Sequence, residues 1–193
     1  MDLIVEMLAG DQVILEPLKE GHREALRAVA AEEEIWRYMP RSAVGDLFEI
    51  WFNEAMELHD NKQQIVFVVR RTINGDVVGS TRFLNLAPEH DRLEIGHTFY
   101  AKEVWGSKVN PNAKLLLLTH AFEVMGGNRV ELRCDALNAR SRAAIVKLGA
   151  QFEGILRQHL LLPSGRRRDT TVFALLKSDW PRVRAGLAAR LSA

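Results

Sequence analysis

The segment from residue 110 to residue 127 predicts an apolar helix that the rest of the chain has to bury. Asn110 is a favourable N-cap, Pro111 fits the first helical position, and Gly126-Gly127 supply the C-terminal stop. Apolar side chains fall on more than one face of this helix: Leu115, Leu116, Leu117, Leu118, Ala121, Phe122 and Met125. Such a helix packs between other layers and does not lie on the surface.

Two β-branched segments before this helix predict a hairpin. Residues 64–71 (QIVFVVRR) and 76–84 (DVVGSTRFL) flank the sequence TING, with Asn74-Gly75 at its centre. Asn-Gly between two such runs favours a tight hairpin turn, because both residues tolerate positive φ. A third strand is expected over residues 92–100 (RLEIGHTFY), directly before the loop that leads into the apolar helix.

The N-terminal part of the chain predicts one strand and two helices. Residues 11–18 suit an edge strand that ends at Pro17. Residues 20–36 have the period of one amphipathic helix. A second helix is expected over residues 45–60, with Asp46 as its N-cap.

The C-terminal part predicts a strand over residues 129–137 and a helix from the cap Asn138 to Gly149. Two strands (151–162 and 169–176) and a short helix from about residue 178 follow. A mixed sheet with helices on both faces, in one α/β domain over residues 1–193, accommodates this order.

Composition excludes several classes of protein. The 26 basic and 25 acidic residues give no general attraction to nucleic acid or anionic membrane. A single cysteine, Cys134, excludes an internal disulfide framework, and the six histidines show no metal-ligand spacing, so no metal is expected. The N-terminus lacks a basic region, and no apolar run reaches the ~20 residues of a membrane span. A cytoplasmic protein is the expectation.

The order of the elements, with several local stretches, resembles the GCN5-related N-acetyltransferase (GNAT) family and its RimJ/RimL-like branch. The stretches are EEEIWRYMP (32–40), LEIGHTFY (93–100), NAKLLLLTHAFE (112–123), NARSRAAIVKLGAQFEG (138–154), GRRRDTTVFAL (165–175) and SDWPRVRAGL (178–187). The resemblance implies a mixed, largely antiparallel sheet in which two adjacent parallel strands splay apart and hold acetyl-coenzyme A between them.

The resemblance also implies the cofactor-binding residues. The strand that carries Phe99 and Tyr100 would pair with the pantetheine arm through its backbone, and Asn138 would line the same site. The loop would hold the pyrophosphate through Gly106, Ser107, Lys108, Val109 and Asn110. Backbone N–H groups at the start of a helix favour phosphate, since the helix dipole is positive there.

The loop departs from the family pattern Arg/Gln-x-x-Gly-x-Gly/Ala. Trp105 stands at the Arg/Gln position, Lys108 at the middle glycine and Asn110 at the last small residue. A non-glycine residue resists positive φ, which puts the tightness of the turn in question. From spacing alone, the loop could equally be a strand-to-helix turn with a cap.

Two residues are candidates for catalysis. Glu94 alternates with Leu93 and Ile95, so it lies either on a solvated face or in position to accept a proton from the incoming ammonium. Ser141 lies in the first turn of the helix after Asn138, where it could stabilise or protonate the leaving thiolate, or only satisfy its own helix end.

Further residues have two interpretations each. Trp36 and Tyr38 would lie at the acceptor mouth by resemblance, or else belong to the core. The run 166–168 of three arginines is either a solvated hairpin or a contact to an acidic acceptor or partner subunit. His97 and His120 are read as structural.

The expected function is transfer of an acetyl group from acetyl-coenzyme A to a primary amine, a protein N-terminus of the ribosomal-protein type. A small-molecule amine as acceptor, and a coenzyme-A-binding regulator without catalysis, stay open. A P-loop phosphotransferase is excluded because no G-x-x-x-x-G-K-[ST] run occurs. A homodimer is also left open.

Overall fold

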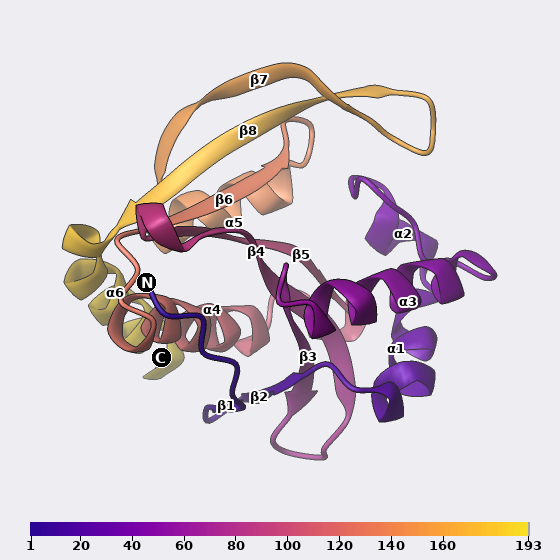
Figure 1. Ribbon diagram of the computed structural model, residues 1–193, viewed down its shortest axis with the longest axis horizontal. Coiled ribbons are helices and arrows are strands. Elements are labelled where there is room, and N and C mark those ends of the chain that lie inside the picture. Colours follow the sequence, from indigo (N-terminus) through magenta and orange to yellow (C-terminus); the bar gives the residue numbers. More distant parts are fainter. Residues whose placement is uncertain (193) are drawn as a thin grey trace.

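The strands form one mixed sheet. The computed structural model describes residues 1–192, and its eight strands lie in the order β1-β2-β3-β4-β5-β6-β8-β7 (Figure 1). The strands are β1 (Leu8–Ala9), β2 (Val13–Pro17), β3 (Ile65–Arg71), β4 (Val77–Ala87), β5 (Arg92–Tyr100), β6 (Arg129–Asp135), β7 (Gln151–Leu161) and β8 (Arg167–Leu176). Neighbouring strands are antiparallel except β5 and β6, which run parallel. The expected fold class is therefore confirmed.

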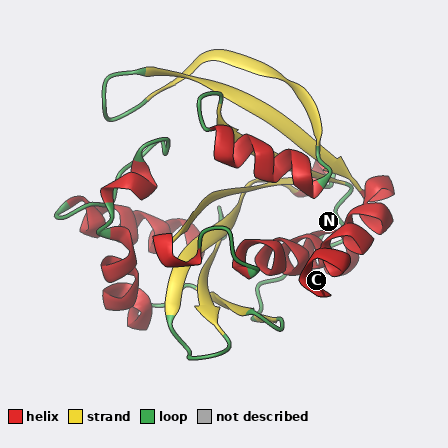
Figure 2. Ribbon diagram, turned by 180° about the vertical axis from the view of Figure 1, so that it is seen from behind, coloured by secondary structure: helices red, strands yellow, loops and turns green. Residues whose placement is uncertain are grey.

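Helices cover both faces of the sheet. We call the two faces the α3 face and the α4 face. The α3 face carries α1 (Arg23–Ala30), α2 (Glu33–Trp36) and α3 (Leu47–Asp60), and the α4 face carries α4 (Val109–Thr119), α5 (Ala139–Leu148) and α6 (Trp180–Ser192). Figures 1 and 2, seen from opposite sides, both show α1–α3 gathered on one side of the molecule and α4 with α6 on the other. Within residues 1–192, no helix is both long and apolar enough to cross a membrane.

Short helical turns connect these elements. They are η1 (Glu20–His22), η2 (Pro88–His90), η3 (Lys102–Val104), the π turn η4 (His120–Val124) and η5 (Lys177–Asp179).

Helix α4 and the turn η4 are buried, as the apolar run predicts. Leu117 and Leu118 have no exposed surface, and Phe122 is 1% exposed. They pack with side chains of the sheet and of α6 in one cluster. Each such side chain contributes about 1.5–3 kcal/mol by leaving water, so this helix is a main source of stability for the α4 face.

The start of α4 differs from the prediction. The helix begins at Val109, so Asn110 and Pro111 lie inside its first turn. Lys108 stands at the N-cap without a side-chain cap, and the Ser107 hydroxyl before it accepts a hydrogen bond from the Val109 amide (3.2 Å). The Asn110 side chain instead accepts one from the Tyr100 hydroxyl (3.2 Å). The prediction that Asn110 is the N-cap is therefore wrong, since a tertiary contact takes its side chain.

The single helix expected over residues 20–36 is broken into α1 and α2. Glu32, between them, has an extended backbone (φ −75°, ψ 107°). The indole N–H of Trp36 donates to the carbonyl of Ala30 (2.8 Å), which satisfies a carbonyl at the end of α1. The side chain of a later residue therefore stops the helix.

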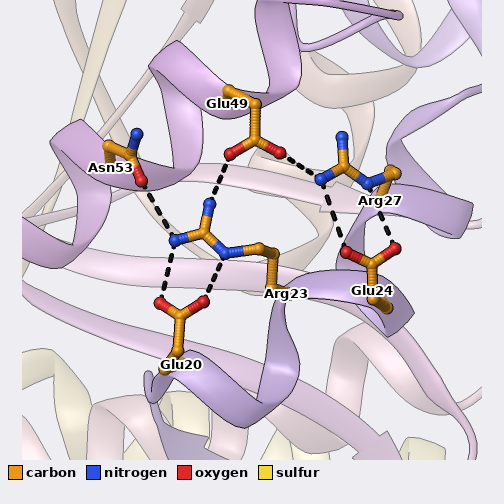
Figure 3. A network of polar contacts seen from close by, with 6 residues as sticks. All are labelled: Glu20, Arg23, Glu24, Arg27, Glu49 and Asn53. Atoms are coloured by element: carbon orange, nitrogen blue, oxygen red, sulfur yellow. Dashed lines mark hydrogen bonds and ion pairs between the residues drawn. The ribbon is translucent and has the colours of Figure 1, made fainter.

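A polar network joins α1 to α3 on the surface (Figure 3). Arg23 donates to Glu49 (2.5 Å) and Asn53 (3.0 Å) of α3, and Arg27 also pairs with Glu49. The guanidinium of Arg23 lies 4.2 Å from the ring centroid of Phe52, so its stem covers the aromatic core beneath. Exposed ion pairs contribute about 0–1 kcal/mol each, so the network mainly orients the helices.

The predicted hairpin is confirmed, whereas the predicted edge strand and the predicted cap at Asp46 are not. The hairpin of β3 and β4 turns at Asn74-Gly75, where Gly75 has φ 75°. β2 is not an edge strand, because β1 pairs with its outer side. Asp46 stands directly before α3, but its side chain makes no capping hydrogen bond.

Candidate active site

The parallel strands β5 and β6 separate after a short paired stretch. Only residues 92–94 of β5 pair with residues 129–131 of β6. Beyond Glu94 and Glu131, β5 runs on to Tyr100 and β6 to Asp135 with no further pairs between the two strands. Because unpaired backbone groups need partners, the facing edges of this gap can bind an extended ligand arm.

The N-termini of two helices lie beyond the open end of this gap. α4 follows β5 and α5 follows β6, so both helices begin near the carboxyl ends of the diverging strands. The Asn138 side chain caps α5 as predicted, accepting from the Ser141 amide (3.0 Å), and Gly149 ends that helix with φ 97°. Two positive helix ends therefore lie at the same end of the gap, where they favour an anionic group.

The loop before α4 resolves the question of its unusual residues. Gly106 has φ 77°, so the left-handed position is occupied by the glycine that the loop retains. Lys108 has φ −74°, which any residue adopts, and therefore does not strain the turn. Gly106, Ser107 and Lys108 are exposed. The Lys108 ammonium is directed to α6, where it donates to the Leu191 carbonyl (2.8 Å).

A stacked pair bridges the two sides of the gap. The guanidinium of Arg140, in α5, lies 3.5 Å from the ring centroid of Trp105, in the loop before α4. The Trp105 indole N–H donates to the Tyr100 carbonyl at the end of β5 (2.9 Å). Trp105, which replaces the family's Arg or Gln, thus ties the loop both to β5 and to α5.

Glu94 is buried on the α3 face, so the interpretation of a solvated face is wrong. Its carboxylate oxygen Oε2 accepts from Asn85 (2.8 Å) and pairs with Arg133 (3.2 Å). The oxygen Oε1 lies over Gly96, where even a Cβ would approach it to 3.0 Å. Burial raises the pKa of Glu94, although Arg133 and Asn85 oppose the shift. The result is a desolvated carboxyl at the point where β5 leaves β6.

Comparison with known proteins assigns this arrangement to a family. The model of the acetyltransferase (GNAT) domain matches residues 12–151. The chain belongs to the GNAT family. Of the curated relatives, "Uncharacterized N-acetyltransferase YoaA" of Bacillus subtilis is 25% identical over 173 residues, 89% of this chain and 97% of the relative.

Two further comparisons give one more relative and one solved structure. "Putative ribosomal N-acetyltransferase YdaF" of B. subtilis is 33% identical over 107 residues, 55% of this chain and 57% of YdaF. The solved structure "Mycobacterium smegmatis RimJ in complex with CoA-disulfide" shares the fold with a TM-score of 0.79 at 20% identity, covering 92% of this chain and 88% of that one. The chain is thus a GNAT acetyltransferase whose neighbours include RimJ, and the gap is the family's splayed strand pair.

In this GNAT chain the side chains of Phe99 and Tyr100 pack inside the protein and not in the gap. Phe99 packs against Trp36 and Trp51, with ring centroids 4.9 and 5.5 Å away. The Tyr100 hydroxyl donates to Asn110, and burial raises the pKa of this phenol, which stays protonated. These two residues can contribute only backbone groups to the gap.

Ser141 and the predicted acceptor residues lie at different parts of the site. Ser141 is half-buried in the first turn of α5, and its amide is satisfied by Asn138. Trp36 is a core residue that also lines a hollow of about 280 Å³ between the segment before α3 and the β7–β8 turn. The Tyr38 carbonyl accepts from Arg168 of β8 (3.4 Å), which connects the same two segments. Both interpretations of Trp36 therefore have structural support.

Sequence patterns do not reveal the role of two further polar residues, Arg82 of β4 and His97 of β5, of which only His97 was expected, as a structural residue. His97 has φ 48° in a bulge of β5, because Arg82 pairs with Gly96 while Ser80 pairs with Phe99. The pKa of His97 is lowered to about 3 by burial and by nearby arginines. Arg82 is 3% exposed on the same face. Alternation along the strand cannot reveal a bulge, and a single arginine in a strand gives no sign that it is buried.

The described residues contain no group of three or more His, Cys, Asp or Glu side chains arranged to hold a metal ion.

Proposed function

We propose that this chain transfers the acetyl group of acetyl-coenzyme A to a primary amine, and that the acceptor is a protein N-terminus of the ribosomal-protein type. The observation that carries the proposal is the gap between β5 and β6, whose paired stretch ends at Glu94 and Glu131. The names of YdaF and of RimJ with its coenzyme A disulfide support the acceptor and the cofactor.

The residues of the gap fit acetyl-coenzyme A as a substrate. The unpaired part of β5 offers backbone groups to the pantetheine arm, and the exposed loop at Gly106 offers its amide to the pyrophosphate at the start of α4, whereas the Ser107 amide already donates to Val104. Asn138 and the first turn of α5 lie on the opposite side of the gap. The chain therefore has partners for both the extended arm and the charged end of the molecule.

Glu94 is the proposed general base. A base works best when its pKa lies near the working pH, and the raised pKa of Glu94 moves it in that direction. His97, with a pKa of about 3, holds a proton too weakly for this role. Glu94 takes one proton from the ammonium, the neutral amine attacks the thioester carbonyl, and a backbone N–H of β5 stabilises the oxyanion. As the oxyanion collapses, the C–S bond breaks, and the second proton of the nitrogen passes to the leaving thiolate, which departs as the free thiol. Ser141 donates a hydrogen bond to the leaving thiolate.

Acetyl transfer is tested by incubating the chain with acetyl-coenzyme A and a panel of amines, with release of free thiol as the readout. We expect peptides with a free N-terminus to react and the same peptides with a blocked N-terminus not to react. If only small amines react, the acceptor is a small-molecule amine and not a protein N-terminus. Binding of coenzyme A without thiol release for any amine would instead identify a regulator without catalysis.

We also propose that the chain forms a homodimer through β7. This strand ends the sheet, so one of its backbone edges is unpaired within residues 1–192. Phe152, Ile155 and Leu161 of β7 are 53%, 51% and 64% exposed. An exposed apolar edge strand favours pairing with another strand. Sedimentation should show a dimer that Ile155→Lys dissociates, and a monomeric wild-type chain would refute the proposal.

A further inference from the structure

Two buried guanidinium groups on the α3 face have no carboxylate partner among residues 1–192. Arg82 is 3% exposed; it donates to Gln64 (2.9 Å) and lies 5.5 Å from the ring centroid of Trp51. Its Nε and Nη2 make no hydrogen bond in the described chain. Arg168 is 6% exposed, donates to the Tyr38 carbonyl, and has an unpartnered Nε.

The carboxylates around these two arginines already pair with other arginines. Glu54 pairs with Arg41, Glu94 with Arg133, and Asp135 with Arg166. Arg82, Arg41 and Arg168 all lie close enough to His97 to lower its pKa, so the imidazole is neutral and the local charge is positive. The excess positive charge therefore belongs to the whole group of arginines around His97 on the α3 face.

The two arginines approach the gap from opposite sides. Arg82, in β4, lies opposite Gly96 of β5, over which the Glu94 oxygen Oε1 is placed. Arg168, in β8, lies two residues before Thr170, which pairs with Asp135 at the end of β6. The cluster therefore flanks the place where β5 and β6 diverge, on the same face as Glu94.

An unpaired buried guanidinium is costly, because it loses its hydration without gaining a counter-ion. The planar fork of Arg is suited to bind a carboxylate through two hydrogen bonds. We propose that Arg82 and Arg168 bind a carboxylate of the acceptor, so that the preferred substrate is an amine with a carboxylate close to it. This inference rests on the proposed function. Acidic side chains near a peptide N-terminus and small amino acids both offer this chemistry.

Matched acceptor pairs test the inference and separate these two sources. One pair is an amidated tetrapeptide with Glu or Gln at its second position; the other is β-alanine and its amide. The values of kcat/KM are calculated on the concentration of neutral amine, so that differences in amine pKa do not enter. We expect the carboxylate member of one pair to have a kcat/KM about 10- to 100-fold higher than its amide, because a hydrogen bond to a charged group contributes a free energy of this size. Equal values within both pairs would overturn the inference while leaving acetyl transfer intact.

Variants locate the carboxylate site. Arg168→Gln and Arg82→Gln should each raise KM for the carboxylate acceptor more than for its amide partner, so that the preference within the pair shrinks. Arg71→Gln, at the hairpin end of β3, is the matched control and should keep the full preference. The melting temperature of each variant is measured to check that it folds. If Arg82→Gln does not fold, the kinetics of Arg168→Gln alone decide the test. An undiminished preference in folded Arg168→Gln would refute the assignment.

Direct binding keeps this test separate from turnover. Calorimetry of the Glu and Gln peptides, and of β-alanine and its amide, with the coenzyme-A-bound protein measures the carboxylate preference without reaction. Tighter binding of a carboxylate member that is lost in Arg168→Gln supports the site even if no amine is acetylated, in which case only the proposed function fails. No difference in either pair refutes the carboxylate site.

Discussion

At the scale of single residues, Glu94 differs from its neighbouring carboxylates in having one oxygen engaged and one directed over a glycine. Asn85 and Arg133 both contact Oε2, while Oε1 faces Gly96. The position combines a fixed orientation with one oxygen, Oε1, that accepts no hydrogen bond from a side chain in the described residues. Three predictions at this scale concern Glu94, Ser141 and Lys114.

Glu94→Gln should lower turnover by up to ~10²–10⁴-fold, because the amide keeps the shape but cannot accept a proton. Wild-type kcat/KM should fall as pH drops through the raised pKa of Glu94, and the variant should lack this limb. Its deficit should also shrink at high pH, where the free amine is abundant. Coenzyme A affinity is the control. Identical pH profiles for the two proteins would move the base elsewhere.

Ser141→Ala should lower turnover, at most by ~10²–10⁴-fold, with little change in melting temperature. The stability should hold because the backbone amide of Ser141, and not its hydroxyl, bonds to Asn138. Ser178→Ala, in η5, is the control for loss of a serine hydroxyl away from the gap. Full activity with a small loss of stability would mean that Ser141 only supports its own helix end.

Lys114 should make stability depend on pH. It is buried in α4, with its ammonium near Thr98 (3.2 Å), and burial lowers its pKa from 10.5 to about 7. Between these values the unfolded chain binds a proton that the folded chain does not, so stability should rise with pH from about 7 to 10.5. Melting temperatures should show this rise in wild type relative to Lys114→Met. Parallel curves would contradict it.

At the scale of elements, capping determines where the two helices beside the gap begin. α5 is capped by Asn138 through a local contact that its sequence predicts. α4 has no side-chain cap at its N-cap Lys108, and the Asn110 side chain bonds to Tyr100 instead. Local contacts can be predicted from spacing because their partners are a few residues apart. Tyr100 lies ten residues before Asn110, across a loop whose path the sequence does not specify.

Asn138→Ala should lower the free energy of unfolding by about 0.5–2 kcal/mol, the usual cost of losing an N-cap. Asn138→Asp keeps an accepting oxygen and adds a negative charge at the positive helix end, so it should retain the stability. Denaturant unfolding measures both. A loss of the same size in Asn138→Asp would show that the oxygen atom is not what matters.

At the scale of the whole molecule, the two helical layers have different roles around one sheet. The α4 face carries the continuous apolar cluster around α4, and the α3 face carries the buried polar cluster of Glu94, Arg82 and Arg168. Both meet at the gap between β5 and β6. A ligand in the gap would contact both layers and should therefore stabilise the fold as a unit.

Acetyl-coenzyme A should raise the melting temperature, because it binds only the folded protein. At a concentration one hundred times its Kd it adds about 2.7 kcal/mol to the free energy of unfolding. Gly106→Ala should reduce this gain, because alanine is strained at φ 77° in the loop. Gly75→Ala, at φ 75° in the hairpin, is a matched control. It should introduce a similar backbone strain but leave the stabilisation by acetyl-coenzyme A unchanged. An unchanged gain in Gly106→Ala would place pyrophosphate binding outside this loop.

The sequence by itself determined most of the elements and the class of fold. Apolar runs, the Asn74-Gly75 turn and the cap at Asn138 act over short distances, and the strand from residue 92 to 100 has the predicted bounds. The same local patterns in their order indicated the GNAT family. These features depend on backbone preferences and periodicity, which neighbouring residues fix.

The tertiary structure alone decided the chemistry of the site. The break at Ala30 and the burial of Glu94 and Arg82 depend on residues brought from other elements, and the bulge at His97 depends on the register of β5 against β4. Desolvation and charge pairing, which set pKa values, are sums over neighbours in space and not along the chain. The sequence therefore named Glu94 as a candidate, but only the folded sheet made it a desolvated carboxyl on the same face as two arginines without a carboxylate partner among the described residues.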